Sequence, residues 1–297
     1  MTQPALVLNN GVLVPQLGFG TWQAKDGPEA ERAVSTAIQT GYRLIDTAAA
    51  YGNEQSIGRA IEQSLVLAPR QELFVTTKVW NADQGYDETL AAFDKSLERL
   101  NLDYIDLYLI HWPVPAANKY IETWRALEKL YADGKVRAIG VCNFTIDQLE
   151  RLRNETTLTP AINQIELHPY FTQSELRQYC AKHGIIVEAY SPLGGSGAHI
   201  LDDPVITQIA TKYNRTAAQI VLRWHMQLGH IAIPKSTNPD HIISNFQVFD
   251  FTLSNDEMNH INGLDRDVRI GADPNTANFG WNTKLVQIAH HLGLVHW

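Results

Sequence analysis

Short runs of β-branched and aliphatic residues alternate with amphipathic segments along this chain of 297 residues, and this alternation constrains the fold most strongly. Strands that alternate strictly with helices form a parallel sheet, and eight such units favour closure into a barrel over an open, doubly wound sheet. The predicted strands are 17–20, 43–46, 73–78, 104–110, 136–141, 161–164, 185–190 and 231–233. The predicted helices are 29–40, 55–65, 88–100, 120–133, 146–153, 174–183 and 216–228. The sequence therefore predicts an α/β fold, a single (β/α)8 TIM barrel that spans residues 1–297.

Both ends of the chain depart from this alternation. The N-terminal segment predicts a β-hairpin that turns at Asn10 and Gly11, two residues that tolerate positive φ. The segment 280–297 is atypical, and three interpretations stay open: a short closing helix, a partner-binding tail or a remnant of expression. No GxGxxG sequence follows the first strand, and GFGT at 18–21 is too weak a substitute, which argues against a Rossmann domain.

Several predicted helix ends carry residues that are typical of caps. Asp87 is expected to cap the third helix at its N-terminus. Gly41, Gly134 and Gly184 are expected to close the first, fourth and sixth helices, because glycine readily adopts the left-handed conformation that ends a helix.

Composition excludes several classes of partner. The net charge of −8 argues against nucleic acid, because phosphate binding requires a basic face. No stretch approaches the roughly 20 apolar residues of a membrane span, and the N-terminus lacks the pattern of a signal peptide. Cys142 and Cys180 have no metal-ligand spacing and fit a reducing compartment. We therefore expect a cytoplasmic monomer that binds no metal, no membrane and no nucleic acid.

Chemistry in a barrel of this type gathers where the strands end. Reading the strand ends in order gives Asp46, Lys78, His111, Asn143, Gln164, Tyr190 and Lys235. Each alone has an ordinary explanation: Asp46 can cap a turn, Lys78 can extend its charge to solvent, and His111 can be a satisfied core histidine. These separate explanations do not account for the recurrence of polar residues at the carboxyl ends of successive strands. The recurrence indicates a functional site.

Four residues of this region form a set that is suited to carbonyl reduction. Reduction by hydride transfer requires a proton donor for the carbonyl oxygen as negative charge develops on it. A phenol has an ordinary pKa of about 10; a neighbouring ammonium lowers that pKa, and an aspartate keeps the ammonium charged. A histidine donor beside the phenol orients and polarises the carbonyl. Asp46, Tyr51, Lys78 and His111 supply these groups.

Long motifs in this chain resemble the aldo-keto reductases in order and spacing from about Val7 to Phe279. They are GYRLIDTAAAYGNE (41–54), DYIDLYLIHWP (103–113), IGVCNF (139–144), NQIELHPY (163–170), YSPLGG (190–195) and IPKST (233–237). The chain is most similar to the microbial subgroup that includes the 2,5-diketo-D-gluconate reductases. The resemblance implies reduction of small aldehydes, dicarbonyls or keto-sugars in an eight-fold barrel, with NADP(H) as the coenzyme and NAD(H) as a second candidate.

The resemblance also implies roles for residues by their position in these motifs. Tyr51 resembles the general acid, with Asp46 and Lys78 tuning it and His111 orienting the substrate. The implied coenzyme-binding residues are Gly20, Thr21, Trp22, Cys142, Asn143, Gln164, Tyr190, Ser191, Leu193, Gly194, Gly195, Lys235, Ser236, Thr237, His241 and Asn245. Among these, Asn143 and Gln164 resemble the holders of the nicotinamide carboxamide, and Tyr190 the residue that stacks on the ring. The implied substrate-binding residues are Trp22, Tyr51, Trp80, His111 and Trp112.

The loop after the fourth strand and three departures from the family pattern sharpen these expectations. Only nine residues, 112–120, lead from the fourth strand to its helix, which suggests an open pocket for small polar carbonyls. Cys142 replaces the usual serine, and a thiol is a poorer hydrogen-bond donor than a hydroxyl. Asn101 replaces glycine at a position where asparagine also tolerates the left-handed cap. His241 replaces an arginine that contacts the adenosine phosphate, so we expect a weakened preference for NADPH over NADH.

Two other functions stay open at this point. The first is a nucleotide-binding regulatory subunit of the same fold, in which turnover is secondary; the short N-terminal segment argues against it. The second is an unrelated barrel isomerase or aldolase that uses Lys78 as a Schiff-base amine. An aspartate partner that keeps the lysine charged argues against that role. The physiological substrate and the preferred reaction direction do not follow from the sequence.

Overall fold

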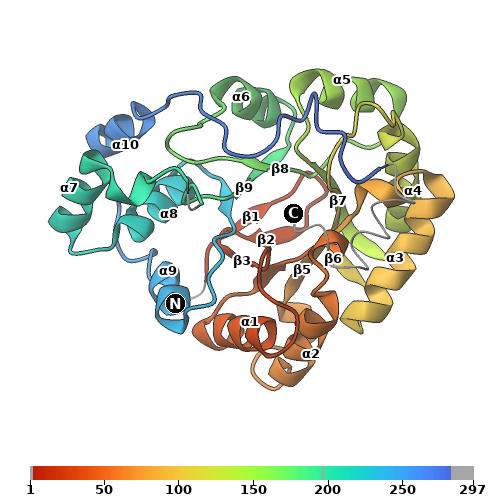
Figure 1. Ribbon diagram of the computed structural model, residues 1–297, viewed down its shortest axis with the longest axis horizontal. Helices are drawn as coiled ribbons and strands as arrows, with labels where there is room; N and C mark the ends of the chain where they lie inside the picture. The colour runs from red at the N-terminus through yellow and green to blue at the C-terminus, as the bar shows by residue number, and fades with distance from the viewer. Residues whose placement is uncertain (1–2, 196, 282–297) are drawn as a thin grey trace.

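The computed structural model describes residues 3–195 and 197–281, and its central feature is a sheet of eight parallel strands surrounded by helices (Figure 1). The strands are β3 (Gly18–Gly20), β4 (Leu44–Asp46), β5 (Phe74–Val79), β6 (Ile105–Ile110), β7 (Val136–Cys142), β8 (Ile162–Glu166), β9 (Ile186–Tyr190) and β10 (Ile231–Ala232). They pair in sequence order from β3 to β10, as strictly alternating units require. The eight predicted strands are thereby confirmed, with ends that differ by a few residues.

Hydrogen bonds between the first and last strands close the sheet. Leu17 and Ala232 form a parallel bridge, and the Ala232 amide donates to the Gln16 carbonyl at 3.1 Å. The Gly20 amide donates to the Pro234 carbonyl, also at 3.1 Å. The (β/α)8 barrel predicted from the alternation of elements is therefore confirmed.

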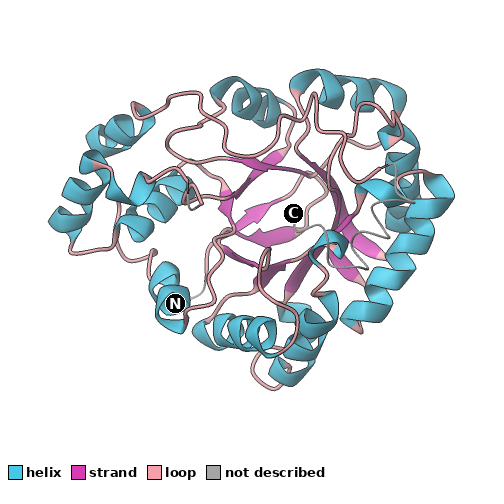
Figure 2. Cartoon of the chain, viewed as in Figure 1, coloured by secondary structure: helices cyan, strands magenta, loops and turns pink. Residues whose placement is uncertain are grey.

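The seven predicted helices are present around the sheet (Figure 2). They are α1 (Pro28–Thr40), α2 (Glu54–Ser64), α3 (Tyr86–Leu100), α4 (Tyr120–Ala132), α5 (Ile146–Glu155), α6 (Ser174–Lys182) and α8 (Ala217–Gln227). Four single 3-10 turns also occur, η1 (Ala49–Tyr51), η2 (Arg70–Glu72), η3 (Asn81–Asp83) and η4 (Ile200–Asp202).

The sequence prediction omitted three short helices in the last third of the chain. They are α7 (Pro204–Tyr213), α9 (Pro239–Phe246) and α10 (Asn255–Asn262). Each begins after a residue whose side-chain oxygen accepts from a backbone amide of the first turn: Asp203, Asn238 and Ser254. The sequence contains these N-cap residues. The apolar stripes that follow them are only two or three turns long, so the pattern alone did not indicate helices.

The helix ends test the predicted caps. Asp87 is not the cap of α3, because the helix begins at Tyr86 and Gly85, at φ 131°, is its N-cap; Asp87 lies in the first turn. Gly41, Gly134 and Gly184 follow α1, α4 and α6 with positive φ, as predicted. Asn101 caps α3 in the left-handed region at φ 53°, the conformation that glycine usually adopts at a helix C-terminus.

The N-terminal hairpin, β1 (Ala5–Val7) paired with β2 (Leu13–Pro15), closes one end of the barrel. Leu8 and Val14 of this hairpin are buried against the interior side chains Leu44, Phe74 and Leu107. The predicted hairpin is confirmed, and its apolar plug covers the end of the barrel where the strands begin. The opposite end, where the strands stop, is left for polar side chains.

Two further predictions concern membrane spans and the C-terminal tail. Within residues 3–195 and 197–281, no helix is long and apolar enough to cross a membrane. The atypical tail 280–297 lies outside the described residues except for its first two positions.

Candidate active site

The carboxyl ends of the strands bring the predicted polar residues together. Asp46 ends β4, Lys78 lies one residue before the end of β5, and His111 follows β6 directly. Asn143 follows β7, Gln164 lies in β8, and Tyr190 ends β9. The parallel register places these ends at one rim of the barrel. Lys78 and Gln164 are fully buried, with 0% and 1% of their surface exposed, so neither extends to solvent.

Lys78 lies at the centre of the four residues that the sequence predicts to be catalytic. Its Nζ donates to Asp46 Oδ1 at 2.7 Å, to the Thr47 carbonyl at 2.9 Å and to Tyr51 Oη at 3.2 Å. An ammonium carries three hydrogens, so all three have an acceptor. Because the phenol oxygen of Tyr51 accepts from Lys78, its own proton points elsewhere. Tyr51 as a whole is half-buried.

The electrostatics of these groups differ in one respect from the sequence prediction. Burial raises the pKa of the Tyr51 phenol above its ordinary value, and the nearby Lys78 charge lowers it only in part. The net shift is therefore upward, opposite to the one predicted. The phenol is therefore protonated at neutral pH, and the charge of Lys78 offsets part of the effect of burial on its pKa. Burial alone lowers the pKa of Lys78, but the charges of Asp46 and Tyr51 outweigh it, so the pKa is raised and the ammonium stays charged.

His111 completes this group as a neutral imidazole. Burial, and then the charge of Lys78, lower its pKa well below the ordinary value. Its ring contacts the rings of Tyr51 and Trp80 edge-on, with centroid distances of 5.7 Å and 5.3 Å. Its Nδ1 has no hydrogen-bond partner among the described residues. Because the ring is neutral, a hydrogen bond from it to another group adds no charge.

A second polar group lies next to the first, around Asn143. The Tyr190 hydroxyl donates to Asn143 Oδ1 at 2.8 Å, and Asn143 Nδ2 donates to the His111 carbonyl at 3.1 Å. Asn143 adopts φ 65°, a left-handed conformation that asparagine tolerates. The same Nδ2 lies 3.1 Å from Cys142 Sγ, so the thiol that replaces serine contacts this amide.

Gln164 lies between the group around Lys78 and the group around Asn143: its amide oxygen lies 3.7 Å from Cys142 Sγ, and its amide nitrogen binds Asp46. Its Nε2 donates to Asp46 Oδ2 at 2.8 Å and to Glu188 Oε2 at 2.9 Å. The sequence prediction did not include Glu188. Its signal was weak: a single charged residue among the apolar positions of β9, which alternate between the interior and the exterior of the barrel.

The remaining residues predicted for the coenzyme lie along the rim from β3 to β10. Thr21 is buried, and its hydroxyl donates to the Asp46 carbonyl at 3.0 Å. A side chain at Gly20 would meet the Ile233 carbonyl at 2.9 Å, so the close approach of β3 and β10 requires glycine. Positive φ recurs in the loop after β9, at Ser191, Gly194 and Gly195. Leu193, in the same loop, is half-buried.

The segment after β10 is different in character. Lys235, Thr237 and His241 are exposed, and Ser236 is half-buried. Within the described part of the chain, Lys235 Nζ donates to the Gln23 carbonyl at 3.3 Å. Asn245, on the buried side of α9, is 6% exposed. The cationic and hydroxyl groups of this segment are therefore available to an anion from solvent.

Aromatic side chains lie beside His111, and Trp22 follows β3 at the same rim of the barrel. Trp22 is 47% exposed, Trp80 contacts His111, and Trp112 is buried. Phe279, which the sequence prediction did not include, packs against Trp80 and Trp112 with centroid distances of 6.1 Å and 5.1 Å. Its carbonyl accepts from Asn81 Nδ2 at 2.9 Å. Figure 1 shows the segment after α10 running past α6 and α5 toward this region.

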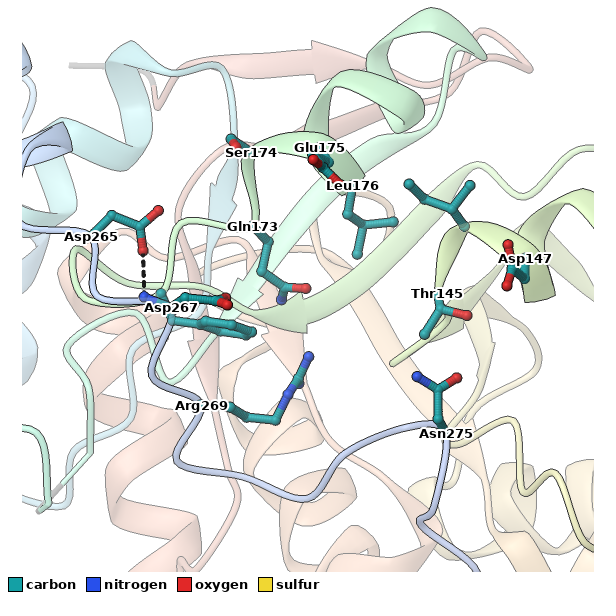
Figure 3. Close-up of a pocket in the computed structure, with 12 residues that line it drawn as sticks. Thr145, Asp147, Gln173, Ser174, Glu175, Leu176, Asp265, Asp267, Arg269 and Asn275 are labelled. Atoms are coloured by element: carbon teal, nitrogen blue, oxygen red, sulfur yellow. Dashed lines mark hydrogen bonds between the residues drawn. The ribbon is translucent and has the colours of Figure 1, made fainter.

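A cavity of about 600 Å³ lies beside this segment, between the first turns of α5 and α6 (Figure 3). It is lined by Thr145, Asp147, Gln173, Glu175, Asp265, Asp267, Arg269 and Asn275, among others. Arg269 crosses it and lies over the Phe171 ring. None of the predicted site residues lines this cavity.

Comparison with known proteins agrees with this geometry. The aldo/keto reductase family model matches residues 16–266. The chain belongs to this family. A glyoxal reductase of Bacillus subtilis is 53% identical over 92% of this chain and 96% of its own length. The solved structure of an aldo/keto reductase from Brucella melitensis is 52% identical, with a TM-score of 0.85, over 89% of this chain and all of that one.

A third relative was solved with a coenzyme. The aldo-keto reductase of Bombyx mori in complex with NADP is 39% identical, with a TM-score of 0.85, and the match covers 92% of this chain and 96% of that one. Membership of the family makes this protein an enzyme, a carbonyl oxidoreductase. The regulatory subunit and the Schiff-base enzyme considered from the sequence are therefore not needed to explain the site.

Proposed function

We propose that this reductase converts small aldehydes, dicarbonyls or keto-sugars to alcohols with NADPH, and that Tyr51 is the general acid. The observation that carries the proposal is the set of hydrogen bonds around Lys78, whose three donors bind Asp46, Thr47 and Tyr51. This arrangement leaves one proton of the set, that of the Tyr51 hydroxyl, available at the mouth. A single available acid beside a neutral histidine suits reduction of a carbonyl better than hydrolysis or Schiff-base chemistry.

The residues present fit an extended nicotinamide dinucleotide. The half-buried Tyr190 ring offers a face for the nicotinamide, and Asn143 lies beside it with an amide group for the carboxamide. Gln164 offers its amide oxygen, since both hydrogens of its Nε2 are already bound. The left-handed backbone at Gly194 and Gly195 suits a loop whose amides face a pyrophosphate. Lys235 and Ser236 offer a cation and a hydroxyl to the adenosine 2′-phosphate. When bound, the reduced nicotinamide supplies the hydride that reduces the carbonyl carbon.

The proton step follows from the geometry of the chain's own residues. A substrate oxygen lies within reach of both the Tyr51 hydroxyl and the His111 ring, whose edge-on contact keeps the two groups adjacent. His111, which is neutral, orients the carbonyl through a hydrogen bond. As negative charge develops on that oxygen, Tyr51 donates its proton, and Lys78 stabilises the phenolate that remains. Asp46 holds Lys78 in place throughout.

The walls of the pocket favour small substrates. Trp22, Trp80 and Trp112 border the mouth, and Phe279 packs against the last two. The glyoxal reductase of Bacillus subtilis, at 53% identity, supports dicarbonyls such as glyoxal and methylglyoxal as the substrate class. Membership of the microbial subgroup of 2,5-diketo-D-gluconate reductases remains part of this proposal, and keto-sugars are included for that reason.

The test is oxidation of NADPH and, separately, NADH in the presence of methylglyoxal, followed by the absorbance of the reduced nicotinamide. We expect turnover with both coenzymes and a faster rate with NADPH at equal concentration. A panel of a dicarbonyl, an aromatic aldehyde, a keto-sugar and a steroid ketone then defines the substrate class. Absence of turnover with every carbonyl, in a protein that binds NADPH, would contradict the proposal.

A further inference from the structure

One buried carboxyl beside the catalytic set takes no part in the steps above. Glu188 lies on β9, where the parallel register aligns it with Gln164 on β8, and Gln164 in turn aligns with Cys142 on β7. Glu188 is 0% exposed. Burial of a carboxyl inside a barrel reduces stability unless the group is paired, and no Lys or Arg bonds to this one among the described residues. Its presence there therefore requires another explanation.

The hydrogen bonds of Gln164 supply that explanation. An amide nitrogen carries two hydrogens, and in Gln164 one binds Asp46 Oδ2 while the other binds Glu188 Oε2. Both hydrogens of the amide nitrogen are thereby bound, which fixes the plane of the amide. In the flipped orientation the amide oxygen would face the Asp46 carboxylate, which pairs with Lys78. The amide oxygen instead lies toward Cys142 Sγ, at 3.7 Å.

We propose that Glu188 is a positioning residue that holds the Gln164 amide in the orientation in which it binds the coenzyme carboxamide and contacts Asp46. The inference rests on the proposed function, since it takes Gln164 as one of the groups that hold the carboxamide. Glu188 acts through Gln164 and touches neither substrate nor coenzyme. The second oxygen of Glu188, Oε1, has no hydrogen-bond partner among the described residues. The hydrogen bond from Gln164 to Oε2 is therefore the one that the side chain of Glu188 makes within this part of the chain.

The charge state of Glu188 suits this role. Burial, and then the charge of Asp46, raise the pKa of Glu188 to about 8. Asp46 on β4, Lys78 on β5 and Cys142 on β7 are the titratable groups that face it from other strands of the barrel. The carboxyl is therefore mostly neutral at pH 7, and a neutral amide of the same shape can replace it.

Two variants separate positioning from simple packing. Glu188→Met keeps the length of the side chain but removes the acceptor, whereas Glu188→Gln keeps an acceptor oxygen. Coenzyme affinity is measured by quenching of tryptophan fluorescence, which needs no turnover. We expect the Kd for NADPH to rise about three- to tenfold in Glu188→Met, the range for loss of one neutral hydrogen bond. We expect Glu188→Gln to bind within about twofold of the wild type, because it remakes that bond.

Thermal unfolding of the coenzyme-free protein gives the second readout. The Tm of Glu188→Met should change little, because removal of a buried carboxyl with an unpartnered oxygen offsets the cost of leaving one hydrogen of Gln164 without an acceptor. The matched control is Glu54→Met. Glu54 is also buried, at 1% exposure, but Thr77, Ser96 and Arg99 all donate to it. That variant should lower the Tm and leave the Kd for NADPH unchanged.

Each outcome decides the inference. A wild-type Kd in Glu188→Met, or failure of Glu188→Gln to restore affinity, would overturn it. A Glu188→Met protein whose Tm falls as far as that of Glu54→Met, or that does not fold, would also overturn it, because Glu188 would then be a packing residue. Failure of the proposed function looks different: the wild type would bind NADPH and reduce no carbonyl, while the affinities of the variants would still differ.

Discussion

The two ends of the proposed coenzyme site differ sharply in burial. At the nicotinamide end, Lys78, Asn143 and Gln164 are at most 3% exposed, and most of their polar atoms have a protein partner. At the adenosine end, Lys235 and His241 are exposed, and their charged or polar groups reach solvent. Interactions in the buried end are strong and depend on one geometry, whereas those in the exposed end are screened by water and salt. Substitutions should therefore abolish chemistry at the first end and adjust coenzyme preference at the second.

The largest effect should follow from Tyr51→Phe at the buried end. The ring remains and keeps its contact with His111, but the proton for the forming alkoxide is lost. General acid catalysis contributes about 10²–10⁴-fold, so kcat should fall by at least that order. The Kd for NADPH, measured by fluorescence quenching, should hardly change. Wild-type kcat in this variant would show that Tyr51 is not the acid.

Lys78→Met should reduce turnover by about 10²-fold or more, because the charge that stabilises the phenolate is gone. The structure adds a loss of stability that the sequence did not indicate. Asp46, at 2% exposure, loses its ionic partner, and breaking a buried ion pair costs about 3–5 kcal/mol. The free energy of unfolding, from urea denaturation, should fall accordingly.

The double variant Lys78→Met, Asp46→Asn sharpens this comparison. Replacing the unpaired carboxyl by an amide should recover part of the lost stability, but it cannot restore turnover. Recovery of both stability and turnover in the double variant would show that Lys78 has only a structural role, and it would contradict the proposed mechanism.

The comparison of the two ends also explains which features the sequence could predict. The strands, the hairpin and the polar residues at the strand ends follow from local patterns: β-branched runs, an Asn-Gly turn, and the position of each residue within its strand. Asp46, Lys78 and His111 could be named because each lies at or next to the end of its own strand. Their hydrogen bonds could not be predicted, since they join strands whose register is set by closure of the barrel.

Glu188 and Phe279 were missed for this physical reason. Glu188 has a function only because Gln164 lies opposite it across the β8–β9 register. Phe279 reaches Trp80 and Trp112 from a segment without regular secondary structure, about 200 residues away from Trp80 in the chain. The direction of the Tyr51 pKa shift was predicted wrongly because desolvation depends on packing that no local pattern contains.

At the exposed end, His241→Arg should change coenzyme preference without changing the chemistry. Arginine adds a permanent charge and a planar fork that suits bidentate contact with the 2′-phosphate. A charge-assisted hydrogen bond is worth roughly 1.5–3 kcal/mol, or at most about a ten- to hundredfold gain in affinity for NADPH. Exposure of position 241 places the expected gain near the lower value, about tenfold. NADH affinity should stay the same, and equal effects on both coenzymes would show that position 241 does not contact the 2′-phosphate.

The smallest effect should come from Phe279→Ala, at the substrate side of the buried end. Removal of the ring takes away its edge contact with Trp112, at 5.1 Å, and its tilted contact with Trp80. Aromatic pairs contribute about 0.5–1.5 kcal/mol, so KM for an aromatic aldehyde should change by about two- to tenfold. KM for methylglyoxal should change less, because so small a substrate is held mainly by Tyr51 and His111. The kcat for both substrates, and the Kd for NADPH, should remain close to the wild type. A large fall in kcat with methylglyoxal would mean that Phe279 supports Tyr51 and His111 directly. The claim that Phe279 only forms a wall of the substrate pocket would then be wrong.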